Sequence, residues 1–490
     1  MTGLEYVIAK GGITLKSTSI IKSYWAFLRY IGMCHLFKPM LFLRDPTLIK
    51  QMLVKDFEHF IDHSTIMSED IEPLWGKHLF SLKGERWKQM RATLSPSFTS
   101  SKMKGMFELM KKCTENFVHF FQHQNLEVIE INLKDAFSRY ANDVIASTIF
   151  GVECDSLKDP KNEFFLMGKE ATNFTGFWKL FSFLFIIYTP KFAPLIGARM
   201  LSTKVSNFFR KLVKGNIEFR EKTGMVRPDM IHLLMEARKG ILKYEEDKIL
   251  ESGFAAVQES EIDKSYSQKC QELTDDDLVA QALIFFMAGF ETSSSLLSFT
   301  VYELAVNSDV QNKLRDVIDD VDEESDRIVT YETVSNIKYL DMVLSECLRK
   351  WPSVMSVDRI CVKPYVIQPT KVDEKPVFIS KGDLLCLPMY PIHRDPCLYP
   401  NPDRFDPERF NEENKSNITS NCFVPFGIGP RSCIGSRFAL LESKILLYYL
   451  VLNYEFVVIQ KTEIPLKLSK KQFSLSAGKG FWVGFKRRRA

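Results

Sequence analysis

The stretch that most constrains the fold of this chain is P-F-G-I-G-P-R-S-C-I-G, residues 425–435. It places one thiol, Cys433, in a glycine-rich turn two residues after an arginine. A helix-like segment, 436–452, follows directly, so Cys433 should lie at a helix N-terminus. Unpaired backbone N–H groups and the helix dipole favour a thiolate there. The sequence therefore predicts a cysteine held as a ligand at the start of a helix.

The spacing within this stretch is unlikely to arise by chance. Its fixed positions are Phe426, Gly429, Arg431, Cys433 and Gly435, and composition predicts such a pattern in roughly 10⁻⁴ of chains of this length. The two glycines should let backbone amides approach the sulfur, and the arginine could bind an acidic group beside it. A buried core cysteine after a turn is the alternative, but it leaves the arginine and the aromatic ring without a purpose.

Composition excludes several classes of protein. A net charge of +4 on 490 residues is too small for a nucleic-acid binder. The ten cysteines form no C-x-x-C pair and no zinc spacing, so most should be free thiols in a reducing compartment. The 39 phenylalanines suggest an aromatic-rich interior or pocket.

Periodicity predicts a mainly α-helical body followed by small β elements. Apolar residues at three- and four-residue spacing mark the helices, and short β-like runs begin after Pro352. No repeat divides the chain, so we expect one domain over residues 1–490, with a polar surface segment at 239–272. The predicted helices are 107–122, 135–150, 203–219, 275–307 and 436–452, and the predicted strands include 377–380 and 384–387.

The longest predicted helix carries polar groups in its apolar middle. Thr274 is its expected N-cap, and three aspartates fill the first turn, where the helix dipole favours anions. Further along, A-G-F-E-T puts Glu291 and Thr292 side by side after an apolar run. Burying them has a cost unless they are hydrogen-bonded, so they should have a role. A solvated helix face is the alternative.

Two weaker patterns pair charged or aromatic side chains on one helix face. Glu346 and Arg349 stand three residues apart before a proline break, where a carboxylate and a guanidinium can form an ion pair. Trp87 and Arg91 stand four residues apart, so both can donate to one carboxylate. Either pattern alone also occurs on ordinary surface helices.

Taken in order, these motifs resemble the cytochrome P450 superfamily of haem-thiolate monooxygenases, over about nine tenths of the chain. Stretches such as D-D-D-L-V-A-Q-A-L-I-F-F-M-A-G-F-E-T are similar to animal microsomal members, most of all the insect branch associated with xenobiotic oxidation. The resemblance implies a mainly α fold with small β-sheets and a long central helix over a haem. It also implies that Cys433 is the axial ligand of haem b iron, and that the haem is further contacted by Phe426, Gly427, Arg431, Gly435, Trp87, Arg91, Arg359 and Ala288.

The resemblance also implies the catalytic and structural roles. Thr292 and Glu291 would relay protons, and Gly289 would let the central helix open over the haem. Glu346, Arg349 and Arg409 would form one ion-pair network that holds the haem-binding core together.

The expected partners follow from the same resemblance. Electrons would come from NADPH through a cytochrome P450 reductase or a cytochrome b-type donor, with Lys88 and Arg437 as candidate contacts. A lipophilic substrate would enter a pocket formed by 63–85, 165–200, 285–288, 353–358 and the turn near Phe473.

Localisation would be the cytosolic face of the endoplasmic reticulum. The transmembrane anchor and Pro-rich hinge of microsomal members are missing, so the apolar segment 177–188 would make peripheral contact with the membrane, unless it is simply buried.

Three other interpretations stay open at this point. A reductase-independent haem-thiolate isomerase would lack the acid–alcohol pair, which is present here as Glu291 and Thr292. A protein that binds haem or lipophilic ligands without catalysis, and a helical scaffold without haem, are the others. The reduced, CO-bound spectrum would separate them, whereas the substrate cannot be read from these motifs.

Overall fold

The computed structural model describes most of the chain from residue 28 onward. The described residues are 28–488 without 36–37, 65–66, 68, 175–176, 190–191, 193–196, 198, 243–253, 256–272, 373, 415, 417, 420 and 470–473. Most of the polar segment 239–272 and the turn near Phe473 therefore lie outside the described residues.

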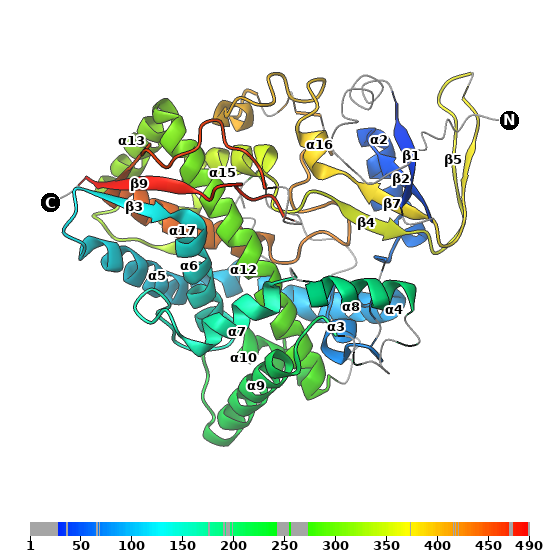
Figure 1. The fold of residues 1–490 in the computed structure, drawn as a ribbon, viewed down its shortest axis with the longest axis horizontal. Coiled ribbons are helices and arrows are strands. Elements are labelled where there is room, and N and C mark those ends of the chain that lie inside the picture. Colours follow the sequence, from blue (N-terminus) through cyan, green and yellow to red (C-terminus); the bar gives the residue numbers. More distant parts are fainter. Residues whose placement is uncertain are drawn as a thin grey trace.

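A long central helix, α12 (Asp275–Val306), organises the fold (Figure 1). Its start is closed as predicted: the Asp277 N–H donates to the Thr274 hydroxyl at 3.2 Å, and the Thr274 N–H donates to the Asp277 carboxylate at 2.9 Å. The helices that pack most extensively on α12 are α3 (Pro73–Lys77), α6 (Leu133–Thr148), α9 (Thr203–Thr223), α15 (Lys338–Lys350) and α17 (Ser436–Asn453).

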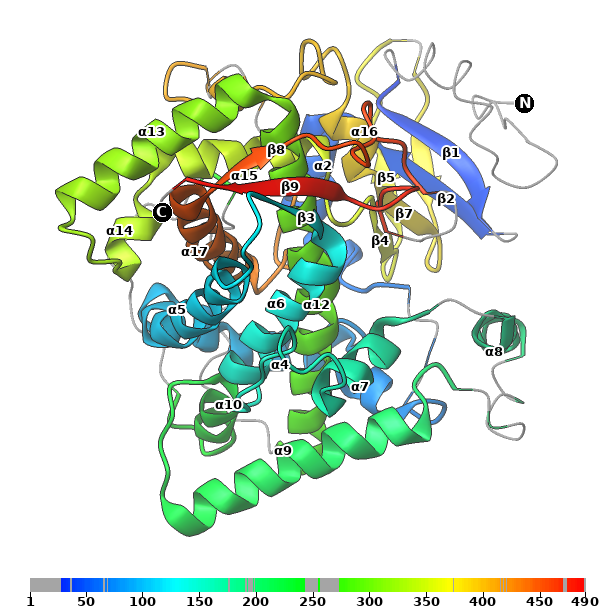
Figure 2. The same ribbon diagram turned by 60° about the vertical axis from the view of Figure 1, so that its left-hand side comes forward.

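The remaining helices surround this bundle, with α13 and α14 on one side of α17 (Figure 2). They are α2 (Pro46–Lys50), α4 (Gly84–Leu94), α5 (Ser100–Gln122), α7 (Glu163–Thr172), α8 (Phe177–Tyr188), α10 (Met230–Arg238), α13 (Ser308–Glu324), α14 (Tyr331–Ser335) and α16 (Met389–His393). Short π or 3₁₀ turns occupy Gln51–Lys55, Phe57–His59, Ser95–Phe98 and Pro407–Phe410.

Three small sheets lie around the helices. The largest has the order β1-β2-β7-β4, in which β2 and β7 are parallel and Arg359 of β4 stands opposite Leu385 of β7. The others are β3-β9-β8 and the hairpin β5-β6. The strands are β1 (Tyr30–His35), β2 (Lys38–Leu43), β3 (Val128–Asn132), β4 (Val357–Ile360), β5 (Tyr365–Ile367), β6 (Val377–Ile379), β7 (Leu384–Leu387), β8 (Tyr454–Val457) and β9 (Trp482–Arg487).

The predicted mainly α fold with small sheets is confirmed. The five predicted helices are present, although α5 begins at Ser100 rather than at 107 because its first turn carries polar residues that hide the periodicity. Both predicted strands, now β6 and β7, and the two short closing strands, β8 and β9, are also present.

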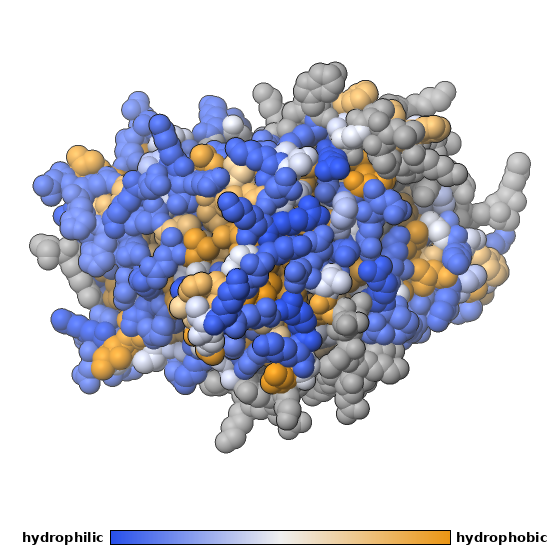
Figure 3. Space-filling view, turned by 90° about the horizontal axis from the view of Figure 1, so that it is seen from below, coloured by the Kyte–Doolittle hydropathy of each residue, from blue (hydrophilic) through white to orange (hydrophobic). Residues whose placement is uncertain are grey.

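Hydrophobic segments serve the core more than the surface. Among the described residues, α12 is the one helix long and apolar enough to cross a membrane, and 72% of its most apolar window is buried as the central core helix. The apolar helix α8 lies apart from α12 at one edge of the molecule (Figure 2), where Phe181 is exposed and Ile186 is buried. The face in Figure 3 is mainly hydrophilic, with scattered hydrophobic groups.

Candidate functional site

The turn before α17 fixes the backbone around Cys433. Gly427 and Gly429 have φ of +78° and +73°, which favour glycine, and a Cβ on Gly429 would lie 2.1 Å from the Leu53 carbonyl oxygen. The Cys433 N–H donates to the Phe426 carbonyl at 2.8 Å and closes the turn. Cys433 therefore stands three residues before Ser436, the first residue of α17.

The prediction that both glycines bring amides to the sulfur is supported for Gly435 and stays a prediction for Gly429. The Gly435 N–H interacts with the Cys433 thiol and favours its ionised form. Gly429 packs against the backbone at Leu53 and Val54. Its lack of a side chain therefore lets the cysteine turn approach the helical turn Gln51–Lys55 closely. The sequence could not distinguish these two reasons for a glycine.

The environment of Cys433 combines two properties that are rarely found together. Its side chain is accessible, yet protein surrounds it so closely that burial raises the pKa of its thiol, against the effects of the Gly435 N–H and Arg91. An accessible thiol inside the protein requires a hollow in front of it. The other described cysteines are also free, and no cluster of three His, Cys, Asp or Glu side chains in the described part could hold a metal ion.

Three buried arginines gather near Cys433. Arg91 of α4 donates to the Ser432 carbonyl at 2.7 Å, which ties α4 to the cysteine turn. Arg431 lies 4.0 Å above the ring of the buried Trp87. Arg359 of β4 donates to the Asp358 carbonyl at 2.7 Å and, at 3.3 Å, contacts Nδ1 of His63. The structure thus brings together four residues from three separate stretches of the sequence: Trp87 and Arg91, Arg359, and Arg431.

The charges in this arginine group do not balance. Arg359 and Arg91 both lower the pKa of Arg431, after burial itself, while Asp62 and Asp358 act in the opposite direction. Burial and the charge of Arg359 also lower the pKa of His63 to about 4, so it is neutral at neutral pH. Arg431 therefore shares the carboxylates of Asp62 and Asp358 with the guanidinium groups of Arg359 and Arg91, an arrangement suited to binding an anion.

Arg431 has partners that the motif alone does not indicate. It donates to the carbonyls of Ile61 at 2.8 Å and Leu82 at 2.7 Å, and its nearest carboxylate oxygen, on Asp62, is 3.5 Å away. Asp62 and Asp358, the latter in β4, were missed because single acidic residues carry no spacing signal.

In the middle of α12, the predicted alcohol Thr292 bonds within the helix, whereas the predicted acid Glu291 bonds to another helix. Ala288 is exposed in the middle of a largely buried helix, and Gly289, Glu291 and Thr292 beside it are half-buried, so this turn also borders a hollow. The Thr292 hydroxyl donates to the Ala288 carbonyl at 2.6 Å. The helix stays continuous through Gly289, where a Cβ would lie 3.0 Å from Cδ1 of Ile145. This glycine admits the close approach of Ile145 on α6, and the opening of the helix at Gly289 stays a prediction.

Glu291 points toward α6 rather than toward Thr292. Its carboxylate pairs with the Lys134 ammonium at 3.0 Å and accepts from the Ser474 hydroxyl at 3.2 Å. Lys134 also donates to the hydroxyls of Ser294 and Ser295 at 2.8 Å each, and burial lowers its pKa. Sequence reasoning missed Lys134, since nothing in its surroundings distinguishes it from a surface lysine.

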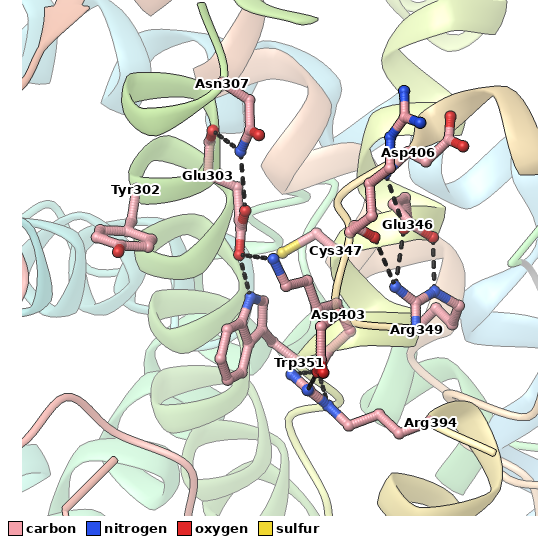
Figure 4. A network of polar contacts seen from close by, with 12 residues as sticks. Tyr302, Glu303, Asn307, Glu346, Cys347, Arg349, Trp351, Arg394, Asp403 and Asp406 are labelled. Carbon is pink, nitrogen blue, oxygen red and sulfur yellow. Dashed lines mark hydrogen bonds and ion pairs between the residues drawn. The ribbon is translucent and has the colours of Figure 1, made fainter. Parts of the chain in front are cut away.

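The predicted Glu346–Arg349 pair forms a fully buried bidentate contact. The two distances are 2.7 and 2.8 Å, and Arg409 approaches the same carboxylate at 3.5 Å. The Asp406 N–H also donates to Glu346 at 2.9 Å (Figure 4).

A second network lies beside it, between α12 and the end of α15. The Glu303 carboxylate accepts from the Trp351 indole N–H at 2.6 Å and pairs with Lys350 at 2.8 Å (Figure 4). In the sequence, Trp351-Pro352 indicates only the end of a helix. It does not indicate that the Trp351 indole donates a hydrogen bond to the central helix.

The expected pocket and surface contacts have mixed outcomes. Phe80, Val354 and Met355 are exposed, whereas Phe285 and Met287 are mostly buried among other side chains. Lys88 is a poor candidate for a surface contact, because it is buried and its ammonium pairs with Glu58 at 2.9 Å and Glu85 at 3.1 Å. Arg437 is half-buried and contacts the Phe98 carbonyl at 3.5 Å.

Comparisons with known proteins point to one family. The family model described as "Cytochrome P450" matches residues 29–483. The chain is 46% identical to "Cytochrome P450 9e2" of Blattella germanica over 476 residues, which cover 94% of this chain and 86% of that protein. It is 41% identical to "Probable cytochrome P450 9f2" of Drosophila melanogaster over 93% of this chain and 86% of the relative. It is 36% identical to "Cytochrome P450 6k1" of Blattella germanica over 93% and 84%.

Proposed function

Because the chain belongs to the cytochrome P450 family and is a monooxygenase, we propose that it inserts one oxygen atom of dioxygen into lipophilic small molecules, xenobiotics or endogenous lipids. Electrons would come from NADPH through a reductase, with a cytochrome b-type protein as a possible second donor. The observation that carries the proposal is an accessible thiol at a helix N-terminus beside a group of three buried arginines.

The residues around this hollow fit haem b. Cys433 would ligate the iron, and the positive group formed by Arg91, Arg359 and Arg431, with the Trp87 indole, would bind the two propionates. Phe426, Gly427 and Gly435 would line the thiolate side, and Ala288 the opposite face. Haem held by a thiolate supplies O–O cleavage and oxygen transfer.

Glu291 and Thr292 would manage proton supply at the substrate side. The Thr292 hydroxyl already donates to the Ala288 carbonyl, so its oxygen lone pairs remain available to accept a proton donor. Glu291 is half-buried and paired with Lys134, which keeps a carboxylate on the same turn of α12 in reach of water. Their role is to hold and pass protons while the packed faces of α12 exclude other water.

The surroundings of the enzyme follow from the same proposal. We propose one catalytic domain, because one hydrophobic cluster includes side chains from Phe57 to Phe485. The protein would act at the cytosolic face of the endoplasmic reticulum, with exposed apolar side chains such as Phe181 of α8 and Phe192 against the membrane surface. The structural role proposed for Glu346, Arg349 and Arg409 is to stabilise the core behind the cysteine turn.

The reduced, CO-bound difference spectrum tests the proposal. The wild-type protein should give the Soret band of thiolate-ligated haem, and Cys433→Ser should abolish it because a hydroxyl cannot replace the thiolate. The matched control is Cys422→Ser, a buried cysteine eleven residues upstream (433 − 422), which should keep the band. A folded, haem-loaded wild-type protein without the band would overturn the proposal.

A further inference from the structure

Gln281 of α12 makes an unusual contact for a residue on a central helix. Its side chain is fully buried, and its amide group bonds to the backbone of a loop rather than to another side chain. The oxygen accepts from the Leu79 N–H at 2.9 Å, and the nitrogen donates to the Lys77 carbonyl at 2.9 Å. The amide thus pairs with one backbone donor and one acceptor, as a neighbouring strand would.

The same loop, residues 78–83 between α3 and α4, is held from the other side by Arg431. In addition to Leu82, at 2.7 Å, the guanidinium reaches the carbonyls of Leu79 at 3.4 Å and Phe80 at 3.5 Å. The loop N-terminus is held too, because Lys77 pairs with Asp277 of α12 at 3.6 Å. We call residues 78–83 the clamped loop.

The position of the clamped loop relates it to the proposed reaction. Gln281 lies on the helix that carries Ala288 and Thr292, and Arg431 lies in the turn that carries Cys433. The loop therefore joins the two elements that border the hollow. Within it, Phe80 is half exposed, and its ring stacks on that of His63 at 4.2 Å between centroids.

We propose that Gln281 is a positioning residue, which keeps the clamped loop rigid and thereby raises the affinity for a lipophilic substrate. A loop that is already ordered loses less conformational freedom when a ligand binds, so holding it by backbone hydrogen bonds favours binding. The two side-chain hydrogen bonds of Gln281 go to Leu79 of the clamped loop and to Lys77, the residue directly before it. The step from a rigid loop to substrate affinity rests on the proposed function, whereas the clamp itself does not.

Hydrogen exchange of the Gln281→Met variant tests the clamp. Methionine keeps the length of the side chain but removes both hydrogen bonds, so exchange within residues 78–83 should rise by about tenfold. Binding of 7-ethoxycoumarin, followed by its spectral shift in the haem-loaded protein, should weaken by roughly threefold to tenfold.

The matched control is Gln311→Met. Gln311 is also buried and makes the same kind of paired backbone contact, donating to the Leu304 and Phe456 carbonyls at 3.0 and 2.9 Å and accepting from the Phe456 N–H at 2.7 Å. Its loss should lower stability without changing exchange in the clamped loop or binding of the coumarin. If Gln281→Met does not fold, Gln281→Glu keeps the acceptor for the Leu79 N–H but loses the donor, and should raise exchange most at the Lys77 end.

Two outcomes would overturn the inference. Exchange in residues 78–83 that is unchanged, or raised equally by the Gln311 variant, refutes the clamp. Faster exchange with unchanged coumarin affinity refutes the positioning role. A missing CO-bound band in the wild-type protein refutes the proposed function instead, and the exchange comparison can be read whether or not haem is bound.

Discussion

Two groups of buried arginines meet carboxylates in different ways. Arg349 is fully buried and bonds to both oxygens of Glu346 at 2.7 and 2.8 Å. Arg431 is nearly as buried, but it comes no closer than 3.5 Å to the Asp62 carboxylate. The first arginine has its counter-ion within the chain, whereas the second shares two carboxylates with two other guanidinium groups.

The difference separates a structural charge from a binding charge. A buried ion pair with bidentate geometry compensates its own desolvation and needs no ligand. A group of buried arginines with too few carboxylates is costly until an anion arrives, so it favours binding of one. The same residue type therefore serves rigidity in one place and recognition in the other, and three substitutions test this comparison.

The largest expected effect is on the closed pair. Arg349→Leu would leave the Glu346 carboxylate buried without its main partner, so the free energy of unfolding should fall by about 3–5 kcal/mol. Urea unfolding, or loss of soluble folded protein, measures this. Lys112→Met is the control, because Lys112 pairs with Glu153 on the surface and its loss should cost at most about 1 kcal/mol. Equal losses in the two variants would contradict the comparison.

A second test compares Glu346 with Glu442, a buried carboxyl group of α17. Glu442 is fully buried, and burial raises its pKa to about 8 against the opposing effect of the nearby Ser293 hydroxyl. The folded protein therefore keeps a proton that the unfolded chain loses above about pH 4.5. The contribution of protonated Glu442 to the free energy of unfolding is complete below about pH 4.5 and is lost as the pH rises toward 8.

The expected slope is a fall of about 1.4 kcal/mol in the free energy of unfolding per pH unit across this window. Glu442→Gln should remove that slope, because glutamine stays neutral, and should stabilise the protein at pH 7 relative to wild type. Thermal or urea unfolding at several pH values measures it. A wild-type slope that survives the substitution would show that Glu442 is already ionised in the folded protein.

The smallest expected effect on stability is in the arginine group. Arg359→Leu removes one of the repelling charges, so the stability of the haem-free protein should change by no more than about 1 kcal/mol, while bound haem should transfer to apomyoglobin about tenfold faster. Arg238→Leu, which breaks pairs with Glu221 and Asp275 near the surface, should leave transfer unchanged. Unchanged transfer in Arg359→Leu would mean that its charge does not bind the haem.

Local features were the most predictable from sequence. The N-cap contact of Thr274 lies within the first turn of α12, and the Glu346–Arg349 pair lies within one turn of α15. In both cases the spacing alone indicates the contact. The position of Cys433 before α17 is similarly local. Arg409 could be assigned to this network only from the family resemblance. Its distance from Glu346 depends on a turn far along the chain, which spacing does not predict.

Sequence reasoning missed contacts where a residue's purpose depends on a distant segment. Gly429 needs no side chain because of the Leu53 carbonyl, and Gly289 because of Ile145 on α6. Lys88 looked like a surface charge, but folding brings Glu58 next to it. Gln281 had no distinguishing spacing, since its partners are backbone atoms of another element.

The sequence by itself determined the kind of chemistry: a cysteine at a helix start, an acid and an alcohol on a central helix, and arginines at set places. Only the tertiary structure decided which charges are balanced and which are not. The physical reason is that desolvation and Coulomb energies depend on distances between elements, and those distances exist only after the helices and sheets have packed. Arg349 and Arg431 look alike in the chain, and they differ because one meets a carboxylate at 2.7 Å and the other does not.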